Sequence, residues 1–252
     1  MKLRDRLEHD GAFLFRWRGH LPLILLVLAI PALFETARMN DRLGEDLSHG
    51  WVFLCMGVSV LGQLFRCVTI GFVPEGTSGR GTKQQKADVL NTDGAYSIVR
   101  NPLYLGNFVA MLGLAMSLMV WWFVALFVLL YWLYIERIIS VEEEFLSRKF
   151  GAAYDEWAAR TPAFIPNFRL WKPSSNSFSF RTVLRREYHG ALAIAGAYFA
   201  VEAILDLAIK GYALKYWLTE DYVWVWFFIA CCVIYMTLHT LKKQTRLLSP
   251  SS

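Results

Sequence analysis

Long apolar runs alternate with short polar segments along the chain. The apolar runs cover roughly Leu21–Ala37, Gly50–Phe72, Pro102–Ile135, Gly190–Ile209 and Tyr222–Leu238. A spanning helix needs about 20 residues, and Pro102–Ile135, which carries no charge, is long enough for two short helices. We expect a helical hairpin there that turns near Ser117–Trp121. The pattern predicts an all-α polytopic transmembrane bundle of about six spans.

The fourth predicted span continues past the membrane into the polar segment Glu136–Ala159. Apolar side chains recur there at helical spacing between charged ones, which predicts a cytoplasmic amphipathic helix. A proline-containing stretch, Thr161–Lys172, ends this helix, and the serine-rich Pro173–Ser179 is expected to be a flexible linker. We therefore divide the chain into a core, residues 1–179 with the first four spans, and a two-span extension, residues 180–252.

Charge and composition support this picture. Hydrophobic residues make up 56% of the chain and charged residues 19%, whereas soluble domains carry about a quarter charged residues. The net charge of +5 comes from basic residues beside the apolar runs, so orientation and anionic lipid contact explain it better than nucleic-acid binding. Loops rich in Lys and Arg alternate along the chain with neutral or acidic loops. This alternation predicts a multi-pass protein with both termini in the cytoplasm. We expect it to lie in a bacterial inner membrane.

The four cysteines all lie in apolar runs, at spacings that suit neither a disulfide framework nor a metal site. We expect no metal and no nucleic-acid partner, and the sequence leaves the oligomeric state undetermined. Arg66, near the end of the second run, is expected to extend its guanidinium to the membrane interface.

The chemistry concentrates in Leu90–Asn107, where a polar loop enters the charge-free hairpin. A helix that starts at Pro102 leaves backbone N–H groups free for an anion, and the Arg100 guanidinium suits a carboxylate or phosphate. Glycines allow close approach of a ligand and tyrosines give flat faces; these residues are Gly94, Gly106, Tyr96 and Tyr104.

Glu142 and Glu143 follow the hairpin and return to the same side of the membrane as Arg100. A simple membrane anchor needs no matched acid and base at the two ends of one hairpin. We therefore favour a ligand site over a plain helix start with a solvated acidic face. Together these groups suit a ligand that has a carboxylate, an amine, a sugar and an aromatic base.

These residues resemble the isoprenylcysteine carboxyl methyltransferase and phospholipid methyltransferase superfamily. Its pattern Arg-His-Pro-x-Tyr-x-Gly corresponds to Arg100–Gly106, and its Glu-Glu pair to Glu142 and Glu143. The trailing Leu146, Phe150–Gly151 and Phe164–Pro166 also fit, so the resemblance covers roughly Leu90–Phe168.

The resemblance implies a cytoplasmic S-adenosylmethionine (SAM) pocket, closed by the segment after the fourth span, with a substrate that enters from the lipid. We carry over as cofactor-binding Gly94, Tyr96, Arg100, Asn101, Pro102, Tyr104, Gly106, Glu142 and Glu143. Among these, Arg100, Asn101 and Glu142 are our candidate catalytic residues.

Asn101 departs from the family pattern, which usually has histidine at this position. An amide cannot take a proton near neutral pH, whereas an imidazole can. A carboxylate or phosphate oxygen needs no base to accept a methyl group, but a protonated amine must first lose a proton. We therefore expect an anionic oxygen as the nucleophile, or another residue that supplies the base.

Two acids lie inside the fifth predicted span. Glu202 and Asp206 are four residues apart, with Lys210 one turn further. Intramembrane acids are costly and often functional, and these could bind a cationic part of the substrate. The alternative is a self-satisfied stack of acid and base on one helix face.

The sequence thus predicts an integral membrane SAM-dependent methyltransferase that acts on a lipid or lipid-linked substrate. Three alternatives stay open: a phospholipid amine N-methyltransferase, an NADPH-dependent membrane reductase of related architecture, and a non-catalytic lipid-binding membrane protein.

Overall fold

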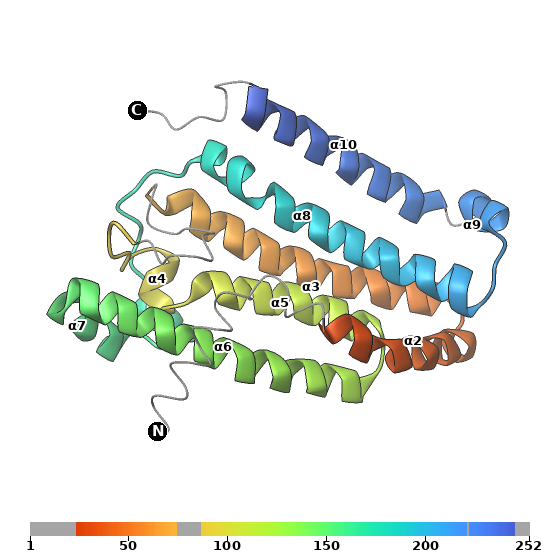
Figure 1. Cartoon of the computed structure of the whole chain (residues 1–252), viewed down its shortest axis with the longest axis horizontal. Helices are drawn as coiled ribbons and strands as arrows, with labels where there is room; N and C mark the ends of the chain where they lie inside the picture. Colours follow the sequence, from red (N-terminus) through yellow and green to blue (C-terminus); the bar gives the residue numbers. More distant parts are fainter. Residues whose placement is uncertain (1–23, 75–86, 221, 245–252) are drawn as a thin grey trace.

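A computed structural model describes residues 24–74, 87–220 and 222–244 of the chain (Figure 1). Within these residues the regular structure is helical, apart from one isolated β-bridge between Gly94 and Lys172. The long helices are α2 (Ile24–Leu43), α3 (Glu45–Phe72), α5 (Pro102–Ser117), α6 (Trp121–Phe150), α8 (Phe180–Ala203) and α10 (Tyr222–Gln244). They lie side by side in one elongated bundle, which confirms the all-α prediction for the described part of the chain.

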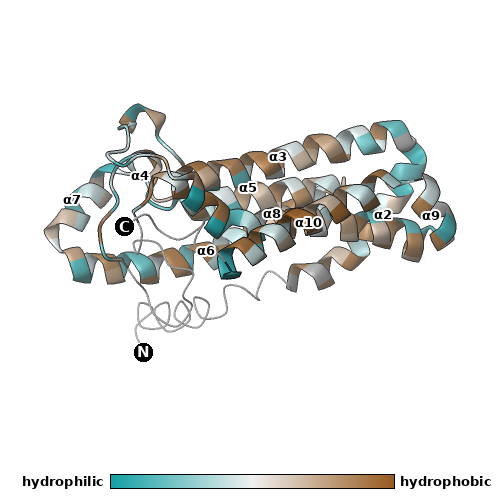
Figure 2. Ribbon diagram, turned by 90° about the horizontal axis from the view of Figure 1, so that it is seen from above, coloured by the Kyte–Doolittle hydropathy of each residue, from teal (hydrophilic) through white to brown (hydrophobic). Residues whose placement is uncertain are grey.

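Each of the six predicted spans corresponds to one long helix. The hairpin turns at Leu118–Val120, as predicted, between α5 and α6. Four of the helices described are long and apolar enough to cross a membrane, namely α3, α6, α10 and α8 with its continuation, whereas α5 has only 16 residues. Figure 2 shows hydrophobic residues along these helices and hydrophilic residues gathered toward the ends of the bundle. The number of spans stays a prediction. The orientation also stays a prediction, because both termini lie outside the described residues.

The polar continuation of α6 is not one helix. It breaks at Gly151, where φ is +57°, and resumes as α7 (Ala152–Arg160). A positive φ costs glycine little, whereas a side chain would clash there. The prediction of one amphipathic helix through Glu136–Ala159 is therefore wrong at this point, because the glycine turns the chain before α7 begins.

Helices α3 and α5 approach each other closely through small residues. A Cβ added at Gly62 would lie 2.5 Å from the backbone nitrogen of Ala110, and one at Gly106 would lie 2.9 Å from the Gly62 carbonyl oxygen. Small residues allow membrane helices to bring their backbones together where no hydrophobic driving force acts between them. Gly106 therefore serves this contact, and it faces α3 and the Arg66 side chain.

This packing gives a first prediction. Gly62→Ala should destabilise the bundle by about 1–3 kcal/mol, because the added methyl group meets backbone that cannot move aside. Gly57→Ala on the same helix meets nothing within 4 Å, so the better helix propensity of alanine should leave stability unchanged or raise it by up to about 1 kcal/mol. Thermal unfolding of the two variants in detergent measures the difference, and equal melting temperatures would contradict the close contact.

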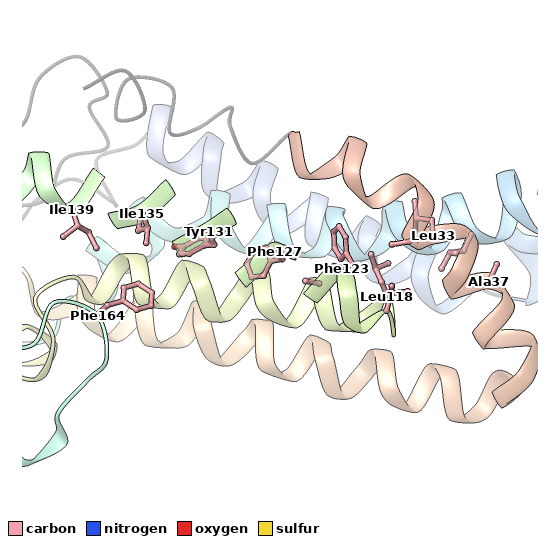
Figure 3. Packing of buried hydrophobic residues seen from close by; sticks show 13 residues of the cluster. Leu33, Ala37, Leu118, Phe123, Phe127, Tyr131, Ile135, Ile139 and Phe164 are labelled. Carbon is pink, nitrogen blue, oxygen red and sulfur yellow. The ribbon is translucent and has the colours of Figure 1, made fainter. Parts of the chain in front are cut away.

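A hydrophobic cluster fills the space between α2, α5 and α6 (Figure 3). Phe123, Phe127, Tyr131 and Ile135 follow one another at helical spacing along the buried face of α6, and Phe164 from the chain beyond α7 completes the row. This row leads from the hairpin turn to the end of the bundle where the motif residues lie.

The C-terminal helices pack onto this core. Helix α8 lies against α3, where the Tyr198 hydroxyl pairs with Ser59 at 2.9 Å, and continues as a π-helix, η3 (Ile204–Ile209). Helix α10 covers the outer side of α8 and follows a short α9 (Leu214–Glu220) (Figure 1). The extension thus shares buried contacts with α3.

Candidate active site

The motif segment begins at a short helix, α4 (Ala95–Ile98), that the chain beyond α7 holds in place. Gly94 precedes it with φ +56°, a conformation that favours glycine. Its backbone N–H donates to the Lys172 carbonyl at 2.9 Å, and the Lys172 N–H donates to the Ser97 hydroxyl at 2.9 Å. The observed role of Gly94 is to shape the backbone that leads into α4.

We call residues 161–172, between α7 and α8, the connection. It runs beside the motif and forms further bonds with it: the Arg100 N–H donates to the Pro162 carbonyl and the Asn167 N–H to the Ile98 carbonyl, both at 2.9 Å. The following serine-rich stretch is also anchored, because Ser175 donates to Asp93 from its N–H at 2.8 Å and from its hydroxyl at 2.6 Å. These bonds connect the stretch, which we expected to be a flexible linker, to the loop before α4, and its flexibility stays a prediction.

Arg100 and Glu143 meet between the two halves of the motif. The Arg100 Nε lies 2.9 Å from the Glu143 Oε1, and both side chains are largely buried. A second guanidinium nitrogen of Arg100 donates to the Ala158 carbonyl at 2.7 Å, which is one of the last carbonyls of α7. A cation is favoured at a helix C-terminus, so Arg100 links α5, α6 and α7.

Tyr104 and Glu142 form the neighbouring pair. The Tyr104 hydroxyl of α5 donates to the Glu142 carboxylate of α6 at 2.8 Å. The buried Tyr131 donates in turn to the Tyr104 backbone carbonyl at 2.8 Å, which fixes the first turn of α5 relative to α6. Pro102 is buried at the first position of that turn, where its missing N–H costs nothing.

Asn101 directly precedes α5, makes no side-chain capping bond to it, and reaches the connection with its side chain. Its side-chain nitrogen donates to the Ala163 carbonyl at 3.0 Å, and its side chain also hydrogen-bonds the Glu143 carboxyl group. The amide thus joins α5, α6 and the connection, a task that requires hydrogen bonding but no proton transfer.

Four buried polar atoms at this end of the bundle have no hydrogen-bond partner. They are the Arg100 Nε and the Glu143 Oε1, whose close approach lacks the direction of a hydrogen bond, together with the Tyr154 hydroxyl and the Trp157 Nε1 of α7. The Tyr154 and Trp157 rings touch edge to face, 5.6 Å between centroids. Buried polar atoms are nearly always paired in native proteins. The Arg100 Nε and the Glu143 Oε1 face each other as an ion pair, so the Tyr154 hydroxyl and the Trp157 Nε1 are the two atoms of this cluster without a polar partner among the described residues.

Two tyrosines beside this cluster keep their protons. Burial raises the pKa of Tyr96 to about 12, helped by the Glu142 carboxylate and opposed by Arg186 and Arg66. Burial and the nearby Glu143 carboxylate raise the pKa of Tyr154 well above its ordinary value. Both hydroxyls are therefore neutral donors at physiological pH.

The structure does not bring Glu202 and Asp206 to this site. Glu187, at the motif end of α8, is fifteen residues before Glu202, which corresponds to roughly 22 Å along a helix. Asp206 accepts from Lys210 at 2.9 Å and from the Trp217 indole at 3.1 Å. Asp206 thus has its hydrogen-bond partners within the C-terminal part of the chain. Substrate binding by Glu202 and Asp206 stays a prediction.

Sequence reasoning missed three contributors to the site. Tyr154 and Trp157 were assigned to the apolar face of an amphipathic helix, although their polar atoms at i and i+3 could have indicated a second function. Arg66 does not extend to the interface but forms a buried ion pair with Glu187, 2.9 Å between Nε and Oε2, and also donates to the Leu103 carbonyl at 3.0 Å. No local signal in the sequence connects Arg66 to Glu187.

Comparisons with known proteins match the chain to a methyltransferase family model and to two kinds of named relative, methyltransferases and metal-resistance proteins. Residues 52–153 match the phospholipid methyltransferase family model. The chain is 34% identical over 114 residues to a protein-S-isoprenylcysteine O-methyltransferase of Schizosaccharomyces pombe, which covers 44% of this chain and 48% of that one. It is 35% identical over 159 residues to a cobalt-zinc-cadmium resistance protein of Cupriavidus metallidurans, covering 63% and 66%.

A nickel-cobalt-cadmium resistance protein of Alcaligenes xylosoxydans xylosoxydans is 37% identical over 91 residues, 36% of this chain and 42% of that one. The matches thus span between two fifths and two thirds of the length of these relatives. No solved structure matches. Among the described residues, no three His, Cys, Asp or Glu side chains gather where they could hold a metal ion. Residues 52–153, which include both motif halves that meet in the structure, are thus similar to the phospholipid methyltransferase family, and one relative is named a protein-S-isoprenylcysteine O-methyltransferase.

Proposed function

We propose that the chain is an integral membrane methyltransferase that uses SAM to methylate an anionic oxygen of a lipid-linked substrate. The observation that carries this proposal is a buried cluster in which Arg100 meets Glu143 as an ion pair beside the Tyr154 hydroxyl and the Trp157 Nε1, which have no hydrogen-bond partner among the described residues. It lies where the hairpin ends meet α7, beside the residues that the family motif contains.

The residues present fit the donor. SAM carries a carboxylate, an amine, ribose hydroxyls and an adenine ring. Arg100 supplies a cation for the carboxylate, Glu142 and Glu143 supply acceptors for the amine or the ribose hydroxyls, and Tyr154 and Trp157 supply donors and flat faces. When bound, SAM offers a methyl group on a positively charged sulfur.

The chemistry needs positioning more than acid or base. With SAM bound, transfer would form a C–O bond on the substrate as the methyl C–S bond breaks, with S-adenosylhomocysteine as the neutral thioether product. An oxygen that is already anionic loses no proton, so Asn101, which cannot act as a base, is compatible with this nucleophile. The rate then depends on holding the reacting atoms in line and on excluding water.

Two relatives support an oxygen nucleophile on a lipid-linked group. The proteins from Schizosaccharomyces pombe and, at 27% identity over 125 residues, from Arabidopsis thaliana are both named protein-S-isoprenylcysteine O-methyltransferases. We therefore propose a carboxylate attached to a lipid chain as the acceptor, which would reach the site sideways from the bilayer.

The test is transfer of a radiolabelled methyl group from SAM, by the purified protein in vesicles, to S-farnesylcysteine derivatives and to a total lipid extract. We expect label that mild base releases as methanol, as from a methyl ester. Label that resists base and stays on amine headgroups would show N-methylation instead. Thermal stabilisation by NADPH but not by S-adenosylhomocysteine would favour the reductase alternative, and stabilisation by neither would favour a non-catalytic lipid-binding protein.

Removal of one hydroxyl tests the role of Tyr104. Tyr104→Phe should lower kcat/KM for SAM about 10- to 100-fold, because a hydrogen bond to a charged group contributes about 1.5–3 kcal/mol. Tyr198→Phe is the matched control, since it removes a buried hydroxyl far from the motif. It should lower stability slightly and leave the kinetics of methyl transfer unchanged. Equal kinetic effects of the two substitutions would contradict the assignment of the Tyr104 hydroxyl to the SAM site.

A further inference from the structure

Three large apolar side chains are exposed on the connection, outside the long helices. Ile165, Phe168 and Trp171 are 75%, 72% and 55% exposed. Lipid covers the exposed apolar faces of spanning helices, but it cannot cover irregular backbone in the hydrocarbon core, where unpaired N–H and C=O groups are too costly. A position at the headgroup layer places the three apolar side chains in the lipid and leaves the backbone polar groups of the connection in contact with water and headgroups.

The depth of the connection agrees with that position. Phe164, directly before Ile165, packs edge to face on Trp132 with 5.5 Å between centroids, and on Phe108 with 5.7 Å. Trp132 is half-exposed one turn before Glu136, the first charged residue of α6. Phe164 thus lies at the level of the last apolar turn of the span, and the Ile165 side chain is exposed at the same level.

Basic residues alternate with these apolar ones. Arg169 lies next to Phe168, Lys172 next to Trp171, and Arg160 ends α7 just before the connection; all three are exposed. Arg160 and Arg169 also line an open hollow of about 770 Å³ together with Arg100 and Phe168. Guanidinium groups beside apolar and aromatic side chains match the phosphate and upper acyl region of an anionic lipid.

We propose that residues 160–172 form a membrane-interface anchor that binds anionic phospholipid headgroups. Ile165, Phe168 and Trp171 enter the interfacial layer, and the basic side chains contact the headgroup phosphates. Because the connection also bonds to the backbone of the motif, lipid contact holds the wall of the candidate active site in place.

The proposal is tested with a nitroxide label at Phe168→Cys in a chain whose four native cysteines are replaced by alanine. A label at Ala153→Cys, exposed on α7, is the matched control. In vesicles of phosphatidylcholine with phosphatidylglycerol, the label at 168 should become accessible to oxygen and shielded from a water-soluble nickel complex, whereas the control stays in water. No methyl donor is used, so the result is independent of the proposed activity.

Arg169→Gln should lower the affinity for phosphatidylglycerol about fivefold in a titration of that lipid, since each basic residue near an anionic surface contributes about 1 kcal/mol. Hydrogen exchange of the unmodified chain provides a second measurement, with slower exchange in residues 164–171 expected when phosphatidylglycerol is present. A label at 168 that stays in water in these vesicles, together with hydrogen exchange that phosphatidylglycerol leaves unchanged, would overturn the proposal.

Discussion

Glu143→Gln should weaken the binding of S-adenosylhomocysteine about 10- to 100-fold. The substitution removes a negative charge that faces the buried Arg100 guanidinium at 2.9 Å. A hydrogen bond between a ligand group and a charged carboxylate contributes about 1.5–3 kcal/mol. The neutral amide also loses an acceptor for the amine or ribose hydroxyls of the ligand. Isothermal titration with S-adenosylhomocysteine measures the change.

The adjacent residue provides the control. Glu144 pairs with Arg148 one helical turn away, and the Arg148 side chain is 74% exposed. Exposed pairs of this kind contribute about 0.2–0.5 kcal/mol, so Glu144→Gln should change the affinity less than threefold. If both substitutions weaken binding equally, general disturbance of α6 explains the result and the assignment of Glu143 fails.

Arg66→Met should destabilise the folded protein by about 3–5 kcal/mol, the largest effect on stability that we expect. Arg66 is bound to both carboxylate oxygens of Glu187, which is 3% exposed. Removal of one partner leaves an uncompensated buried charge, which costs more than the pair itself contributes. The measurement is the midpoint of thermal or denaturant unfolding in detergent.

A second substitution separates this cause from lost packing. Arg66→Met combined with Glu187→Leu replaces the pair with apolar side chains of similar size and should recover most of the lost stability, because no buried charge remains. A double variant as unstable as Arg66→Met alone would show that the packing of Arg66, including its bond to the Leu103 carbonyl, dominates.

Much of the fold could be predicted because membrane helices follow from local composition. The charge-free run Pro102–Ile135 gave both helices of the hairpin and the position of its turn. The break at Gly151 was missed because apolar spacing continues across it, and a single glycine changes the direction of the chain without changing the period. The close pairing of α3 with α5 was also missed, since it depends on which glycines face each other.

The site could be predicted in part, where residues lie at the two ends of one hairpin. Arg100 and Glu143 meet because α5 and α6 return to the same end of the bundle. Glu187 lies 121 residues after Arg66, so its pairing depends on the tertiary arrangement of α3 and α8, which local pattern does not encode. Gly106 packs against α3, a contact that its place in the motif did not indicate, and its role in ligand binding stays a prediction.

The backbone bonds between the motif and the connection have a consequence for divergence. The Gly94–Lys172, Ile98–Asn167 and Arg100–Pro162 bonds all join main-chain atoms, so most substitutions in the connection leave them intact. These bonds therefore place little demand on side-chain identity in the connection. The family match ends at residue 153, just before Tyr154 and Trp157. We expect distant relatives to share the wall that these residues and the connection form, even where their sequences no longer align beyond α6.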